Sequence, residues 1–138
     1  MLEDHLLHRL TQYLKRRTDI AFAFLFGSQA NGAATVRSDV DIAVYFFPNQ
    51  RQPIEFESDL TYEGESTLWA DVEGIVKKEV DMVVLNRVPA TVAAAALRGQ
   101  ALIIKEQGLY LDFMSAVTDE ADSFMDYIIR DYRERYAP

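Results

Sequence analysis

Two periods of apolar and polar residues run along this chain, and together they predict a mixture of helices and strands. Leucines recur every three or four residues within 2–17, and three basic residues follow them, which predicts an amphipathic helix with cations in its last turn. Short apolar runs rich in β-branched and aromatic residues predict strands. These runs occupy residues 20–26, 40–46, 80–85 and 101–105.

Helical periodicity returns in the second half of the chain. Within 60–79 the apolar residues of the second half recur at helical spacing, and we expect Trp69 to pack in the core rather than to stack on a base. Residues 89–98 begin with proline and continue with an alanine run, which predicts a helix with Gly99 as its C-cap. Residues 108–136 predict one long helix whose aromatic residues either pack on the sheet or form a docking surface.

The predicted fold class is α/β, of the α+β kind, with a small mixed sheet flanked by helices and followed by a C-terminal helix. The chain has 138 residues, 49% of them hydrophobic, which is enough for one domain with a real core. No repeat or linker divides it, although residues 48–58 contain two prolines and predict a long loop. We therefore expect one domain, 1–138, in which 109–136 is a C-terminal helical extension.

Charge and composition narrow the functional classes. The formal net charge is −8, so we expect no stable binding to nucleic acid, which depends on Lys and Arg at the phosphates, whereas a basic protein partner is compatible. Cysteine is absent, which excludes disulfides and thiolate metal sites. The first ten residues lack the pattern of a signal peptide, and no apolar run reaches the length of a membrane span. The expectation is a soluble cytoplasmic protein without membrane contact.

The segment 25–44 carries the candidate chemistry. Gly27 and Ser28 end one predicted strand, and Asp39 and Asp41 open the next. Side chains alternate along a strand, so both aspartates face one side while the residue between them points into the core. Two neighbouring carboxylates repel each other unless a proton or a cation lies between them, and oxygen ligands in this geometry favour Mg²⁺. The pair therefore predicts a divalent metal site.

Asp81 is the one charged residue in the predicted strand 80–85. A buried carboxylate must find a cation, hydrogen-bonding partners or a metal, because its desolvation is costly. If this strand lies beside the strand of Asp39 and Asp41, Asp81 completes a site of three carboxylates. The alternative is a carboxylate at the strand edge that pairs with Lys77 or Lys78.

Gly27 and Ser28 predict the phosphate end of the same site. A glycine-serine turn before a short helix exposes backbone N–H groups that can cradle phosphate oxygens, and the Ser28 hydroxyl adds one more donor. Arg37 lies two residues before Asp39. It either supplies positive charge to the phosphates or is a solvated loop arginine.

The complete pattern, G-S-x10-D-x-D between two apolar runs, resembles the DNA polymerase β-like nucleotidyltransferase superfamily. Within it, the chain is similar to the minimal nucleotidyltransferases (MNT), small antitoxins encoded beside HEPN-domain toxins. The resemblance implies the polymerase β-like fold, in which the third carboxylate comes from a later strand, as Asp81 does here. It also implies ATP as the substrate and two Mg²⁺ ions held by the catalytic residues Asp39, Asp41 and Asp81.

The same resemblance implies that Gly27 and Ser28 position the β and γ phosphates. Many minimal nucleotidyltransferases carry arginines just after the Gly-Ser pair, where this chain has Gln29 and Asn31. Less positive charge therefore faces the triphosphate, unless Arg37 supplies it rather than lying solvated in the loop.

For function, the resemblance implies a protein adenylyltransferase that transfers AMP from ATP to a tyrosine hydroxyl of a cognate HEPN ribonuclease toxin. The chain would act as the antitoxin and form a hetero-oligomer with the toxin. Larger relatives that modify antibiotics hold the acceptor with a second helical domain, and the residues after 108 are too few to build one. Two alternatives stay open: a non-catalytic antitoxin that neutralises the toxin by direct binding, and a nucleotidyltransferase acting on a small hydroxylated molecule such as an aminoglycoside.

Overall fold

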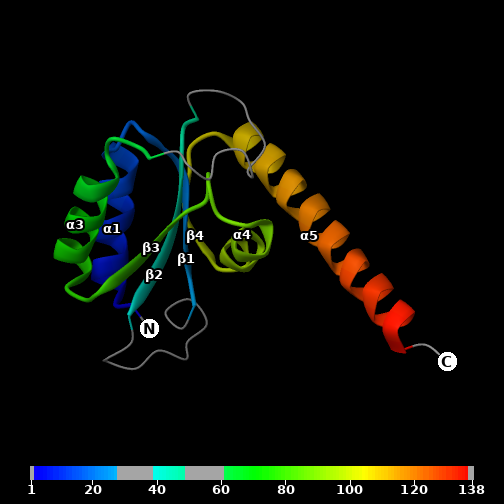
Figure 1. Ribbon diagram of the computed structural model, residues 1–138. Coiled ribbons are helices and arrows are strands. Elements are labelled where there is room, and N and C mark those ends of the chain that lie inside the picture. Colours follow the sequence, from blue (N-terminus) through cyan, green and yellow to red (C-terminus); the bar gives the residue numbers. More distant parts are fainter. Residues whose placement is uncertain (1, 28–38, 49–60, 137–138) are drawn as a thin grey trace.

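The computed structural model describes residues 2–27, 39–48 and 61–136, which form a mixed sheet with helices on both faces (Figure 1). Its four strands lie in the order β3-β2-β1-β4. β1 is antiparallel to both of its neighbours, and β2 is parallel to β3. The strands are β1 Ile20–Phe26, β2 Val40–Phe46, β3 Val80–Val84 and β4 Gln100–Ile104. The predicted α+β class with a small mixed sheet is confirmed.

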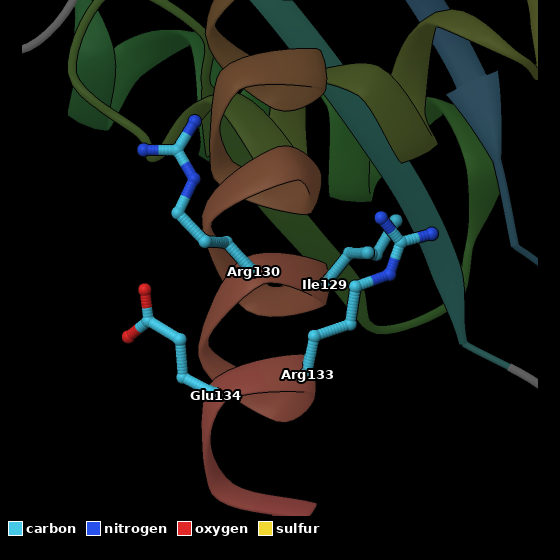
Figure 2. Close-up of a pocket in the computed structure, with 4 residues that line it drawn as sticks. All are labelled: Ile129, Arg130, Arg133 and Glu134. Atoms are coloured by element: carbon cyan, nitrogen blue, oxygen red, sulfur yellow. The ribbon is translucent and has the colours of Figure 1, made fainter. Parts of the chain in front are cut away.

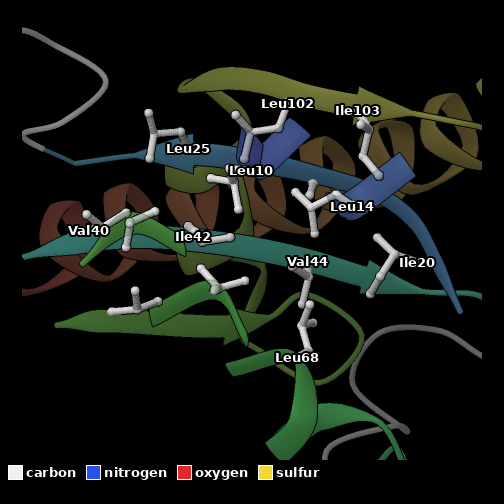
Figure 3. Packing of buried hydrophobic residues seen from close by; sticks show 14 of the residues in the cluster. Leu10, Leu14, Ile20, Leu25, Val40, Ile42, Val44, Leu68, Leu102 and Ile103 are labelled. Atoms are coloured by element: carbon white, nitrogen blue, oxygen red, sulfur yellow. The ribbon is translucent and has the colours of Figure 1, made fainter. Parts of the chain in front are cut away.

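Two helices cover one face of the sheet, α1 (Asp4–Arg16) and α3 (Glu65–Val76). Every second residue of β2 points toward this face, and these side chains are fully buried with the leucines of α1 and α3 (Figure 3). The residues labelled in Figure 3 that make up this contact include Leu10, Leu14, Val40, Ile42, Val44 and Leu68. The period of two in the strand and the leucine spacing in the helix therefore fix which face each element buries.

The other face carries α4 (Ala90–Leu97) and the first part of α5 (Gln107–Tyr136). Phe22 of β1 stacks on Tyr45 of β2, with their ring centroids 4.6 Å apart, and Phe113 of α5 lies 4.7 Å from Tyr45. Beyond this contact α5 continues past α4 and projects away from the sheet (Figure 1). The aromatic residues of α5 therefore pack on the sheet at its start, as one of the two sequence interpretations expected.

Two local predictions were wrong. Trp69 is 40% exposed rather than packed in the core, because its indole N–H donates to the Val80 carbonyl oxygen at 2.8 Å and thereby stays at the surface of α3. The C-cap of α4 is Arg98, in a right-handed conformation, rather than Gly99. Gly99 is instead required by a close approach, since a Cβ there would collide with the Leu25 carbonyl oxygen of β1.

Parts of the prediction fall outside the described residues. These are the turn and short helix expected at 28–34 and the loop expected at 48–58, of which only residue 48 is described. In the described part of the chain no helix is long and apolar enough to cross a membrane.

Candidate active site

One end of the sheet brings two of the predicted carboxylates together. Phe26, the last residue of β1, pairs with Asp41 of β2, and Asp41 pairs with Asp81 of β3. Because β2 and β3 are parallel and in this register, the two aspartates lie side by side on one face. The predicted adjacency of the two strands is confirmed. We refer to this end of the sheet, where β1 ends and β2 and β3 begin, as the carboxylate end.

The register that aligns Asp41 with Asp81 is set at the start of the two strands. The backbone N–H of Val40 donates to the carbonyl oxygen of Glu79 at 2.9 Å, and Val40 itself pairs with Val80. Val40 is buried under α1 and α3. Since side chains alternate along a strand, Asp41 projects from the opposite face, the one that carries α4 and α5.

Asp39 lies two residues before Asp41 and is exposed. Its charge, like that of Asp81, acts on Asp41. Partial burial, the charges of Asp81 and Asp39, and a side-chain hydrogen bond with Asp81 together raise the pKa of the Asp41 carboxyl above its ordinary value. The carboxylate end therefore concentrates negative charge on a half-buried group, which a cation would relieve.

Asp81 is exposed, so the expectation of a buried carboxylate is wrong. The reason is that β3 is an edge strand of the described sheet and leaves the start of its outer face open. The alternative pairing with Lys77 or Lys78 is not seen, since within the described ranges neither lysine forms an ion pair with Asp81. The partner of Asp81 is Asp41.

Gly27 follows β1 directly and lies against Asp41. Its φ of +70° is in the left-handed region, and a Cβ at this position would collide with the Asp41 carboxylate. Glycine is therefore required here both for its backbone conformation and for the space beside the carboxylate. The turn was predicted from sequence, whereas the contact with Asp41 was not. Ser28 and Arg37 lie outside the described residues, so their phosphate-binding roles stay predictions.

The donor set at this end suits a hard divalent cation, because carboxylate oxygens are the ligands that Mg²⁺ prefers. The described residues contain no group of three or more His, Cys, Asp or Glu side chains already arranged to hold a metal ion. They do contain the Asp41–Asp81 pair, with the charge of Asp39 close enough to act on Asp41. These like charges repel one another, and a bound cation would offset the repulsion. Asp39, Asp41 and Asp81 are thus the residues that would hold it.

Basic residues at the carboxylate end were not anticipated as part of a site. Lys77 and Lys78 come just before β3, and Arg98 comes two residues before β4. The strands β3 and β4 both begin at this end, as β2 does. These three basic residues could therefore have been predicted from the sequence, because each lies just before a strand that begins beside the aspartates.

A surface hollow on α5 is separate from the carboxylate end. Among the described residues it is lined by Ile129, Arg130, Arg133 and Glu134, all from the outer part of α5 (Figure 2). In Figure 1 this part of the helix lies well away from the sheet. The hollow therefore belongs to a helix surface rather than to the carboxylate site.

Comparisons with known proteins agree with this fold. Residues 8–108 match the family described as polymerase beta nucleotidyltransferase. A crystal structure of a toxin-antitoxin with AMP-PNP has a similar fold, with a TM-score of 0.64 and 18% identity over 97% of this chain and 94% of that chain. A tri-AMPylated Shewanella oneidensis HEPN toxin in complex with an MNT antitoxin gives a TM-score of 0.61 and 16% identity over 95% and 92% of the two chains.

A crystal structure of the toxin-antitoxin MntA-HepT is also similar, with a TM-score of 0.58 and 16% identity, and covers 96% of this chain and 94% of that chain. No functionally curated protein matches the chain significantly. At these identities the solved structures establish the fold alone.

Proposed function

This chain belongs to the polymerase β nucleotidyltransferase family, and on that premise we propose that it is a Mg²⁺-dependent protein adenylyltransferase. It transfers AMP from ATP to a tyrosine hydroxyl of a cognate HEPN ribonuclease toxin and acts as its antitoxin. The observation that carries the proposal is the pairing of Asp41 with Asp81 across two parallel strands, with Gly27 packed against Asp41.

Each aspartate has a role that follows from its place. Asp39, Asp41 and Asp81 would hold the metal ions, which supply neutralisation of the charge that develops on the transferring α-phosphate. Asp81 is exposed at the sheet edge and is therefore accessible to an incoming acceptor. A tyrosine hydroxyl has an ordinary pKa of about 10 and needs a base at neutral pH. Asp81 accepts this proton.

The transfer forms one bond and breaks another. The tyrosine oxygen attacks the α-phosphorus of ATP, and the new O–P bond replaces the bond from the α-phosphorus to the bridging oxygen of the β-phosphate. Pyrophosphate leaves with that electron pair, while the tyrosine proton goes to Asp81. The turn at Gly27 holds the phosphates in place during this exchange, so that attack and departure stay in line.

A protein acceptor suits the shape of the chain. The outer part of α5 projects beyond the sheet, and Ile129 on it is 44% exposed (Figure 2). A projecting helix offers a partner a surface outside the fold, which a small-molecule enzyme does not need. The solved complexes with a similar fold support the same assignment, since one contains AMP-PNP and another a tri-AMPylated HEPN toxin with its MNT antitoxin.

Intact mass spectrometry of a HEPN-domain protein encoded beside this chain tests the proposal. The protein is incubated with ATP, Mg²⁺ and either wild type or Asp39→Ala/Asp41→Ala. We expect mass increments of one or more AMP units with wild type only, on a tyrosine located by peptide sequencing. If no increment forms and the double variant still inhibits the ribonuclease, the chain is a binding antitoxin without catalysis. Increments on an aminoglycoside with no protein partner would instead indicate a small-molecule enzyme.

A further inference from the structure

Arg98 lies at the carboxylate end, beside the strand that leads into the Gly27 turn. It is the C-cap of α4, the helix that covers the face from which Asp41 projects. The next strand begins two residues later, and Gln100 at its start pairs with Leu25 near the end of β1. The chain therefore delivers Arg98 to the same end and the same face as the aspartates.

The contact of Gly99 fixes this position closely. A Cβ on Gly99 would collide with the Leu25 carbonyl oxygen and lie 2.9 Å from the Cβ of Phe26. Only a glycine therefore lets the end of α4 press against the last residues of β1. Phe26 in turn pairs with Asp41. Strands lie about 4.8 Å apart, so two strand spacings place the backbone of Gly99 about 10 Å from that of Asp41.

Arg98 is exposed, and within the described residues its guanidinium forms no ion pair. A role confined to the helix would be to offset the partial negative charge at the C-terminus of α4. That role alone does not depend on which face of the sheet Arg98 lies on. Lys77 and Lys78 provide the contrast, because they follow α3, which covers the opposite face. Of these basic residues, Arg98 is the one that the fold delivers to the face of the aspartates.

The order of residues across the sheet indicates which ligand Arg98 could contact. Asp81, Asp41, the Phe26–Gly27 turn and Gly99 follow one another from β3 to the start of β4. If the transferred α-phosphate lies at the aspartates, a triphosphate that extends over Gly27 has its outer phosphates beside Arg98. We propose that Arg98 binds the β and γ phosphates of ATP and stabilises the pyrophosphate that leaves.

The chemistry of the side chain fits this role, since a guanidinium donates two parallel hydrogen bonds to phosphate oxygens. Arg98 thereby supplies the positive charge that Gln29 and Asn31 do not provide after the Gly-Ser pair. The inference rests on the proposed function, because it takes ATP as the substrate. It adds a binding residue from a part of the chain remote in sequence from the Gly-Ser turn.

Calorimetric titration with Mg²⁺ and AMP-PNP tests the role of Arg98 without any turnover or toxin. Arg98→Gln removes the charge, and Arg98→Lys keeps it but removes the paired donors. The control Lys77→Asn removes one positive charge from the opposite face. Lys77 has a left-handed backbone conformation, which asparagine tolerates. We expect Arg98→Gln to weaken binding about tenfold, Arg98→Lys less, and Lys77→Asn little. Competition by Mg²⁺-pyrophosphate, which carries only the outer phosphates, should weaken by a similar factor in Arg98→Gln.

The outcomes separate the two proposals. If wild type binds AMP-PNP and Arg98→Gln binds it equally well, the role of Arg98 is wrong while the proposed function stands. An equal loss in Lys77→Asn would show a general charge effect and would also overturn the assignment. If wild type binds no nucleotide in the presence of Mg²⁺, the proposed function fails and the role of Arg98 fails with it. Thermal melting of each variant confirms that it is folded, which we expect because both side chains are exposed.

Discussion

The two ends of the sheet differ in how their polar groups are paired. At the end opposite the aspartates, the buried side chain of Asn86 accepts from the backbone N–H of Phe46 and donates to its carbonyl oxygen, both at 2.9 Å. Arg87, the next residue, donates two hydrogen bonds of 2.7 and 2.6 Å to the carboxylate of Glu65. In these contacts each donor has an acceptor, and the charge of Arg87 has a counter-charge in Glu65, so they stabilise the fold.

The same end also joins α1 to the sheet. The side chain of Arg17 donates to both oxygens of Asp19 just before β1, and it also donates to the carbonyl oxygen of Gly64 before α3. The hydroxyl of Tyr13 donates to Asp71 at 2.6 Å. These hydrogen bonds connect α1, the start of β1 and α3, and one of them, between Arg17 and Asp19, joins opposite charges.

The carboxylate end shows the reverse arrangement. Asp41 faces Asp81 and the charge of Asp39, and its pKa is raised rather than lowered. Within the described residues, Arg98 and Lys77 lie at this end without ion pairs. Like charges that crowd together cost stability, so they are expected where a ligand supplies the missing counter-charge. The contrast itself therefore indicates which end of the sheet is the site.

The largest effect is expected from Asp41→Asn. This change removes a metal-binding carboxylate, so AMP transfer should fall about 1,000-fold or more. The free energy of unfolding should stay equal or rise, because a repulsive charge is removed. Transfer is followed by intact mass and stability by urea unfolding, with Arg87→Ala as the matched control at the opposite end. If Asp41→Asn lost as much stability as Arg87→Ala, the proposed difference between the two ends of the sheet would be contradicted.

The next effect in size is expected from Asn86→Ala. The substitution leaves the buried N–H and carbonyl of Phe46 without partners, which should lower the free energy of unfolding by about 2–3 kcal/mol. Transfer by the folded protein should be unchanged. Asn86→Asp is the informative companion, since its carboxylate accepts from the N–H but cannot donate to the carbonyl. If Asn86→Ala had the same free energy of unfolding as wild type, the hydrogen bonds of Asn86 with Phe46 would not stabilise the fold.

A smaller effect is expected from the Arg87–Glu65 ion pair. Both side chains are partly buried, and the pair is bidentate, so a double-mutant cycle with Arg87→Ala and Glu65→Gln should give a coupling of about 1 kcal/mol. The cycle is needed because Arg87 has further interactions. Urea unfolding supplies the four free energies. A coupling near zero would mean that the two charges act independently despite their contact.

Much of the fold could be predicted from the pattern of the chain, and its failures have local causes. The bounds of β1 and β2 agree with the predicted strands to the residue. The reason is that β1 is wholly apolar, that β2 is apolar apart from Asp41, and that both strands have a face toward each helical layer. Trp69 was misplaced because its helical position did not reveal the hydrogen bond to Val80. The need for glycine at 99 comes from a contact with β1, which no local pattern encodes.

The candidate site was predictable in its residue types but not in its geometry. Asp39 and Asp41 stand out because they open an apolar run, and Asp81 because it is alone in one. Their assembly depends on the parallel register of β2 and β3, which is set by contacts such as the hydrogen bond from Val40 to Glu79. Tertiary pairing of this kind lies beyond what the sequence period can specify.

The smallest effects are expected in the pH dependence of stability, and they should have opposite signs at the two ends. Burial alone would raise the pKa of Glu65, but hydrogen bonds from Arg87 and from the backbone N–H of Tyr62 outweigh it and lower the pKa. Its stabilising contribution is therefore full above its ordinary pKa and is lost as the pH falls through the lowered value. Asp41, with a raised pKa, destabilises the fold at neutral pH, and this cost disappears as acid protonates it.

Urea unfolding from neutral pH into the acid range checks both signs. At neutral pH we expect Glu65→Gln to be less stable than wild type and Asp41→Asn to be equally or more stable. Both differences should shrink on acidification. Differences of the same sign would contradict the contrast between the ends.

The most direct test of the central claim is the stabilisation of the fold by Mg²⁺ and AMP-PNP, measured as the shift in unfolding midpoint. A ligand that binds only the folded state raises that midpoint. If the crowded aspartates form the metal and nucleotide site, wild type and Arg87→Ala should gain equally, while Asp41→Asn should gain little. An equal gain in wild type and Asp41→Asn would place the ligand elsewhere and contradict the account.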